Sequence, residues 1–199
     1  MSKVNLGDIQ KLRELTGMGM MDCKKALEES NGDIEKAIEG LRKKGAAVAA
    51  KRGGNETAQG IVHAYIHPGS TVGVLVEINC ETDFVARNEE FKKFAQDICM
   101  HIAALKPLYL SPADVDQAWL AKEKEIITEL LKNEGKKAEF IDKILEGKIQ
   151  KALAEVCLLQ QKFVKSDKLT VEQVLQELIG KMGESIRIKR FARYEIGNN

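Results

Sequence analysis

A change of hydrophobic period near position 81 constrains the fold of this chain more than any other sequence feature. Apolar residues alternate with other residues from Val72 to Cys80, which is the period of a half-buried β-strand. From Phe91 to Leu105 they recur every three or four residues, as in an amphipathic helix, and Asn88 is placed to cap that helix. The chain is therefore predicted to pass from a strand into a helix through a short connection.

The connection itself carries two large apolar residues, Phe84 and Val85, between the charged residues Asp83 and Arg87. Neither fits the strand period or the helix period. An aromatic side chain in this position either fills the local core or is presented to a partner. Periodicity by itself favours the core, because apolar residues in connections usually pack against the elements that they join.

Composition is typical of a globular protein without a membrane span. The 199 residues are enough for one large domain or two small ones, and a net charge of +1 shows no general preference for polyanions. No basic segment followed by an apolar stretch marks the N-terminus, and no run approaches the ~18 apolar residues of a transmembrane helix. We therefore expect a cytoplasmic protein with no membrane partner.

The residues that usually carry catalytic or metal chemistry form no motif. The four cysteines are widely spaced and lack a C-x-x-C pair, which predicts buried thiols. His63 and His67 lie about 13 Å apart along a predicted strand, too far apart to share a metal, and His101 has no partner in the sequence pattern. Glycine-rich phosphate loops and nucleophile motifs are also absent. The chain is predicted to need no cofactor or metal and not to be an enzyme.

Residues 1–45 are predicted to form three short helices. Gly17, Met18 and Gly19 separate the first two, Asp33 is placed to cap the third, and Gly45 is placed to end it. This pattern is similar to the ubiquitin-associated fold, in which the turn between the first two helices commonly contributes to a partner surface. The methionines of that turn either serve this purpose or fill the small core. A linker is expected over residues 46–59.

Residues 60–199 are predicted to form an α+β domain. Strands at 61–67 and 72–80 are joined as a hairpin, and a third strand is expected over 185–196. Helices are expected at 88–105, from Ser111 toward Lys132, in two pieces separated by Gly147, and from Thr170 onward. The simplest architecture with this order is a three-stranded, largely antiparallel sheet that is covered by helices on one face.

Four segments resemble the bacterial elongation factor Ts family, in the family's order. The run Thr82–Phe91, TDFVARNEEF, resembles the family signature, and Leu12–Met21, LRELTGMGMM, resembles the start of its N-terminal module. Cys157–Val164, CLLQQKFV, and Arg190–Gly197, RFARYEIG, resemble its C-terminal part. Longer members carry two strand-and-helix modules, and this chain shows one. It therefore resembles the short form, for which the family implies a homodimer.

The resemblance implies a guanine nucleotide exchange factor that binds elongation factor Tu in its GDP-bound and nucleotide-free states. The Asp83/Phe84 loop would insert near the magnesium and phosphate site and promote GDP release. The predicted contact residues in the connection are Thr82, Asp83, Phe84, Val85, Arg87 and Asn88. Those predicted in the N-terminal module are Leu12, Met18, Met20 and Met21. Residues 60–199 would then supply both exchange and dimerisation.

Two alternatives remain open from the residues themselves. The chain could act as an adaptor that holds a partner at the ribosome without affecting nucleotide, or as an enzyme with an unrecognised site. A cluster of basic and aromatic residues near the C-terminus also has the composition of a small RNA surface, although the balanced overall charge argues against direct nucleic-acid binding. These residues are Arg187, Lys189, Arg190, Phe191, Arg193 and Tyr194.

Overall fold

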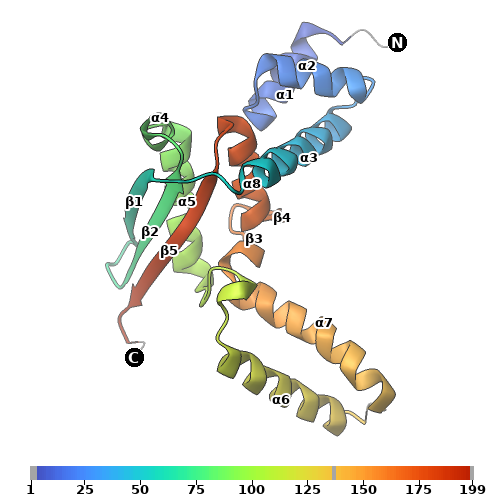
Figure 1. Ribbon diagram of the computed structural model, residues 1–199, viewed down its shortest axis with the longest axis vertical. Coiled ribbons are helices and arrows are strands. Elements are labelled where there is room, and N and C mark those ends of the chain that lie inside the picture. Colours follow the sequence, from blue (N-terminus) through green and yellow to red (C-terminus); the bar gives the residue numbers. More distant parts are fainter. Residues whose placement is uncertain (1–3, 136–137, 198–199) are drawn as a thin grey trace. The chain divides into compact units, whose positions relative to one another are not determined.

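A computed structural model describes residues 4–135 and 138–197 of the chain (Figure 1). It belongs to the α+β class, as predicted. The chain folds into two compact units that interleave along the sequence. One holds the N-terminal part up to His63 with residues 76–96 and 172–189, and the other holds residues 64–75 and 97–171 with the end of the chain from Arg190. The division into a module of residues 1–45, a linker and a domain of residues 60–199 stays a prediction.

The N-terminal module consists of the three predicted helices, α1 (Leu6–Thr16), α2 (Met20–Glu29) and α3 (Ile34–Arg52). Helix α1 ends at Gly17, whose positive φ of 66° suits glycine. The Asp33 side chain caps α3 by accepting a hydrogen bond from the backbone N–H of Lys36, as predicted. The three helices enclose a common core of Ile9, Leu12, Met18, Cys23, Ala26, Leu27, Ala37 and Leu41.

The prediction that α3 ends at Gly45 is wrong, because the helix continues to Arg52. Gly45 lies inside the helix, where it permits close packing against α8 (Val171–Met182). A Cβ atom at Gly45 would lie 3.0 Å from the carbonyl oxygen of Gln176, and one at Gly180 would lie 2.8 Å from the Cα atom of Gly45. The alanines that follow Gly45 favour helix, so the first part of the predicted linker is helical.

The predicted three-stranded antiparallel sheet is present, with the strand order β1-β2-β5. Its strands are β1 (Gln59–Ile66), β2 (Val72–Cys80) and β5 (Ile186–Glu195). Along β2 every second residue from Val74 to Cys80 is buried. Helix α5 (Glu89–Leu105) follows β2 in the chain, as the sequence predicts. The strand-to-helix order read from the change of period is therefore confirmed.

The segment after α5 differs from its prediction in two places. A long helix was predicted to begin at Ser111, and Ser111 does form a capping box with Asp114, but this opens only the short 3₁₀ helix η1 (Pro112–Asp114). The backbone becomes extended at Val115, and Asp116 caps α6 (Gln117–Asn133) separately. Helix α7 (Ala138–Val156) then runs through Gly147 without a break. The two helices lie side by side in Figure 1 around a core that includes Ile127, Leu131, Ile141, Ile149 and Leu153.

A second, two-stranded antiparallel sheet was not expected from the sequence. A 3₁₀ helix, η2 (Leu158–Gln160), leads into its strands β3 (Lys162–Phe163) and β4 (Ser166–Thr170). Helix α8 begins directly after Thr170, as predicted, and ends at Met182, directly before Gly183 with its positive φ. Within residues 4–135 and 138–197, the chain has no helix that is long and apolar enough to cross a membrane.

Candidate partner-binding site

The connection after β2 folds into a one-turn helix, α4 (Asp83–Ala86). Thr82 precedes it in an extended conformation, and its hydroxyl accepts a hydrogen bond from the N–H of Val85 at 3.4 Å. Asn88 follows it and accepts from the N–H of Glu90 at 2.8 Å, so it caps α5 as predicted. The connection is therefore a single helical turn with a capping side chain at each boundary.

The two apolar side chains of this turn point to opposite environments. The Phe84 side chain is 81% exposed, whereas Val85 and Ala86 are buried. Consecutive positions on a helix point in different directions, so Phe84 can face solvent while the residue next to it, Val85, faces the core. The interpretation of Phe84 as a core plug, which periodicity favoured, is wrong. Val85 fills that place.

An ion pair lies beside the exposed ring. The carboxylate of Asp83 is 3.0 Å from the guanidinium of Arg87, and both side chains are largely accessible to solvent. Pairs of this kind contribute at most about 1 kcal/mol to stability. Asp83 and Arg87 therefore remain available for polar contacts with a partner.

The base of the turn is held by two carboxylates that the sequence did not single out. Glu184 accepts hydrogen bonds from the N–H of Thr82 at 3.0 Å and from its hydroxyl at 2.7 Å. Glu81 accepts from the N–H of Ser185, from Asn55 at 3.1 Å and from Arg52 at 3.0 Å. These hydrogen bonds lower the pKa of Glu81, and the bond from the N–H of Ser185 has the largest effect. The carboxylate therefore stays ionised.

Sequence reasoning missed this network because its members come from three distant segments. Arg52 lies in the segment that was predicted to be a linker, and Glu184 follows a glycine in a loop without a motif. No periodicity or spacing in the sequence indicates that a charged residue will pack against the end of a strand from a distant segment. The weak signal that did exist was the cap-like residue Thr82 at the start of the connection.

Two of the four contact residues predicted in the N-terminal module are buried. Leu12 is fully buried, Met18 belongs to the module's core, and Met20 packs against that core. Met21 is 76% exposed. The side chain of Leu15, which was not proposed, is also exposed. The fully accessible residue of the predicted surface is therefore Met21, because Leu12 and Met18 fill the interior and Met20 is partly buried against it.

The basic cluster near the C-terminus is partly used inside the fold. Arg187 donates to the carbonyl oxygens of Gly53 and Asn55, and Arg193 donates to the carbonyl oxygen of Ala103. Arg193 also pairs with Glu195, and together with Lys106 it lowers the pKa of that carboxyl to about 2. These two arginines hold backbone segments in place.

The buried histidine His101 has a structural role. One ring nitrogen lies 2.9 Å from the side-chain oxygen of Gln161, and the other accepts from the N–H of Val164 at 3.1 Å. Burial lowers the pKa of His101, which favours the neutral ring that can donate at one nitrogen and accept at the other. Among the residues that the structure describes, no three His, Cys, Asp or Glu side chains are grouped as a metal site would require.

A stability profile between pH 7.5 and 5.5 tests this role. The lowered pKa makes the contribution of His101 fully present above its unfolded pKa of about 6.5 and progressively lost below it. We expect the free energy of unfolding in urea to fall by up to about 1.4 kcal/mol per pH unit below 6.5. His101→Gln should be less stable at pH 7.5 and show a flatter profile. Equal slopes for the two proteins would contradict the assignment.

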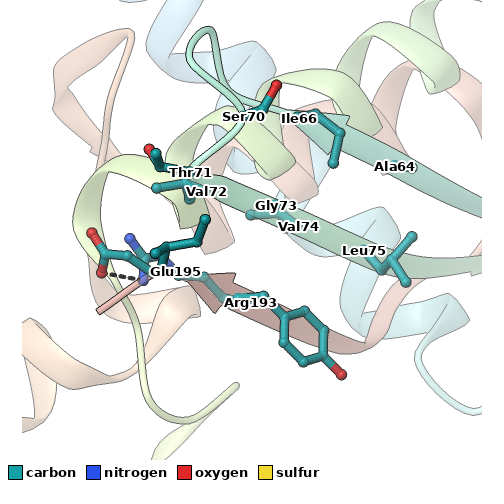
Figure 2. Close-up of a pocket in the computed structure, with 12 residues that line it drawn as sticks. Ala64, Ile66, Ser70, Thr71, Val72, Gly73, Val74, Leu75, Arg193 and Glu195 are labelled. Atoms are coloured by element: carbon teal, nitrogen blue, oxygen red, sulfur yellow. Dashed lines mark hydrogen bonds and ion pairs between the residues drawn. The ribbon is translucent and has the colours of Figure 1, made fainter. Parts of the chain in front are cut away.

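The open face of the three-stranded sheet carries a shallow apolar hollow of about 590 Å³. Figure 2 shows Ala64, Ile66 and Leu75 along two neighbouring strands, with Arg193 and Glu195 on the third. Tyr194 and Ile196 also line it. The side chains of Ile66 and Tyr194 are exposed in the single chain. This face is thus an uncovered apolar surface of the kind that marks an interaction site.

Known proteins of one family match this chain over nearly its whole length. Residues 8–198 match the family model described as Elongation factor TS. The protein named elongation factor Ts of Carboxydothermus hydrogenoformans is 56% identical over 189 residues, which cover 95% of this chain and 87% of that protein. That of Desulforamulus reducens is 52% identical over 197 residues, which cover 99% of this chain and 91% of that protein. The chain therefore belongs to the elongation factor Ts family of translation elongation factors.

Proposed function

We propose that this chain is a guanine nucleotide exchange factor for elongation factor Tu and acts in the cytoplasm, without covalent chemistry. It binds the GDP-bound form, inserts the turn that carries Asp83 and Phe84 near the magnesium and phosphate site, and promotes GDP release so that GTP can bind. Family membership supports the partner and the activity. The exposed ring of Phe84 supports the role of the turn.

The exposure of Phe84 is the observation that carries the proposal. A phenylalanine side chain in water forgoes about 1.5 to 3 kcal/mol of stabilisation that its burial would supply. The turn beneath it is held by caps and by buried Val85, so the ring is presented on an ordered support. Pre-ordering of this kind lowers the entropic cost of binding. The turn therefore has the properties of a wedge that becomes buried only in a complex.

Magnitudes limit what this wedge can do alone. A 10⁴-fold acceleration of GDP release corresponds to a barrier lowered by about 5.5 kcal/mol. Burial of one phenylalanine supplies about half of that at most. Displacement of groups that support the bound magnesium, together with contacts from Asp83, Arg87 and Met21, must supply the rest, because the diphosphate is held largely through the metal.

Reciprocity follows from this scheme. A factor that weakens GDP binding must itself be bound more weakly by the same ratio when GDP is present. The reaction is therefore reversible, and nucleotide concentrations determine its direction.

Release of fluorescent GDP from elongation factor Tu tests the proposal. With this chain in catalytic amounts and excess unlabelled nucleotide, we expect release to accelerate by orders of magnitude. Binding of the same chain to elongation factor Tu should be measured in parallel, with and without GDP. Binding without faster release would favour the adaptor, and equal affinity in both conditions would contradict exchange by reciprocity.

We further propose that two chains associate through the open face of the sheet. This face carries the apolar side chains of Ala64, Ile66, Leu75 and Tyr194, which a second copy of the same sheet would cover. Two sheets that pack face to face bury such side chains between them. The family's short form, with one strand-and-helix module, supports the same arrangement.

Sedimentation of two matched variants tests the dimer. Ile66 and Leu108 are each 62% exposed, but only Ile66 lines the hollow (Figure 2). At micromolar concentration the unmodified chain and Leu108→Lys should sediment with the mass of two chains. Ile66→Lys should sediment as one chain, because it would place a charge in the apolar contact. A single-chain mass for all three proteins would sink the dimer.

A further inference from the structure

The loop between α8 and β5 contacts the residue before helix α4, the turn that carries Phe84, through the side chain of Glu184. The carboxylate of Glu184 accepts from the hydroxyl of Thr82 at 2.7 Å and from the N–H of the same residue at 3.0 Å. These residues are 102 positions apart in sequence. Both carboxylate oxygens are thus used on one residue, the one directly before Asp83 and Phe84.

The neighbouring residues Glu81 and Ser185 form a second contact, in which the loop residue is the donor and the carboxylate lies next to β2. The N–H of Ser185, a buried residue, donates to the carboxylate of Glu81, which also binds Arg52 at the end of α3. Two consecutive residues of the loop therefore hold the two consecutive residues that directly follow β2. Such a pair of contacts fixes both the position and the direction in which the chain enters the turn.

The turn depends on these contacts for its geometry. Helix α4 spans only four residues, which is too short to be stable by itself. The hydroxyl of Thr82 donates to Glu184 and accepts from the N–H of Val85, so one group links the loop to the first turn of the helix. Because the ring of Phe84 is exposed, its placement follows from the backbone below it.

From this geometry we infer that Glu184 is a positioning residue for nucleotide exchange. Its carboxylate holds Thr82 so that the turn presents Phe84 in the orientation that enters the partner. Hydrogen bonds to a carboxylate are stronger than those between neutral groups, which suits this task. The inference rests on the proposed function of the turn. Without the carboxylate, the turn would spend only a fraction of the time in the competent geometry, and the exchange rate would fall by that fraction.

Three substitutions at position 184 separate geometry from charge. Glu184→Ala removes both contacts and should slow GDP release about 10-fold at subsaturating concentration. Glu184→Gln should largely restore the rate, because its amide can accept from the N–H of Thr82 and donate to the hydroxyl. Glu184→Asp keeps the charge but moves the carboxylate oxygens away from Thr82 by about one bond length. Its rate of GDP release should therefore be as low as that of Glu184→Ala. Glu134→Ala, which removes a carboxylate of the α6–α7 hairpin, serves as a charge control.

A double-mutant cycle with Phe84→Ala distinguishes positioning from general stability. If Glu184 acts through the ring, Glu184→Ala should cause little further loss once the ring is absent. A merely structural role would reduce the rate by the same factor in both backgrounds. Equal factors would therefore overturn the inference.

The outcomes of this experiment are separable from those of the proposed function. No acceleration by the unmodified chain would overturn the proposed function itself. Acceleration that Phe84→Ala loses but Glu184→Ala and Glu184→Asp retain would overturn the role of Glu184 alone. If circular dichroism shows that Glu184→Ala is unfolded, the Asp and Gln variants test the inference in its place. A full rate of GDP release with Glu184→Asp would then also overturn the positioning role.

Discussion

Replacement of Phe84 by alanine is expected to slow GDP release from elongation factor Tu about 10- to 100-fold while leaving the fold intact. The rate factor follows from the loss of about 1.5 to 3 kcal/mol that burial of the ring would contribute in the complex. Because the ring is exposed in the free chain, the free energy of unfolding should change by no more than about 0.5 kcal/mol. Fluorescent GDP release and urea unfolding measure the two effects.

Two other phenylalanines provide matched controls. Phe91, seven positions further along, is fully buried, and Phe91→Ala should lower the free energy of unfolding by about 3 to 5 kcal/mol. Phe140, on α7, is 53% exposed, and Phe140→Ala should leave both release and stability unchanged. A large loss of stability in Phe84→Ala would argue against an exposed wedge. An unchanged release rate would assign exchange to other contacts.

Replacement of Gly60 by alanine is expected to cost about 2 to 5 kcal/mol of stability. Gly60 lies near the start of β1 with a φ of +152°, which side chains rarely adopt. A Cβ atom there would lie 2.2 Å from the carbonyl oxygen of Ile78, so the two strands would have to separate. This contact lies close to Glu81, and the damage should therefore also reach the turn.

Gly54→Ala is the control for this experiment, because a Cβ atom at Gly54 would meet nothing within 4 Å. Urea unfolding of both variants should show a large loss for Gly60→Ala and a change within about 0.5 kcal/mol for Gly54→Ala. If Gly60→Ala unfolded at the same urea concentration as the unmodified chain, the close approach of β1 to β2 would be wrong.

Elements with long regular periods were predictable from the sequence. The alternation along β2 and the helical spacing along α5 each sum many small burial preferences, which outweigh any single residue. Caps that act on the adjacent backbone, such as Asp33 and Asn88, were also predictable, since their partners lie two or three residues away.

Single glycines and short capping motifs were less reliable signals. Gly45 and Gly147 were interpreted as breaks, yet both lie inside helices. At Gly45 the reason is packing, because a neighbouring helix approaches too closely for a side chain. The predicted helix start at Ser111 forms a capping box but opens only three residues of helix. A local motif permits an element to begin, but packing decides how far it continues.

The sequence by itself determined the order of the long helices and of the three strands of the larger sheet, the position of the turn and the resemblance to the family, because all of these depend on neighbours along the chain. Only the tertiary structure decided that Phe84 faces solvent while Val85 faces the core, and that Leu12 and Met18 are buried. It alone brought Glu184 to Thr82. These outcomes depend on which segments pack together, and a residue cannot carry in its own local pattern the identity of a partner about a hundred positions away.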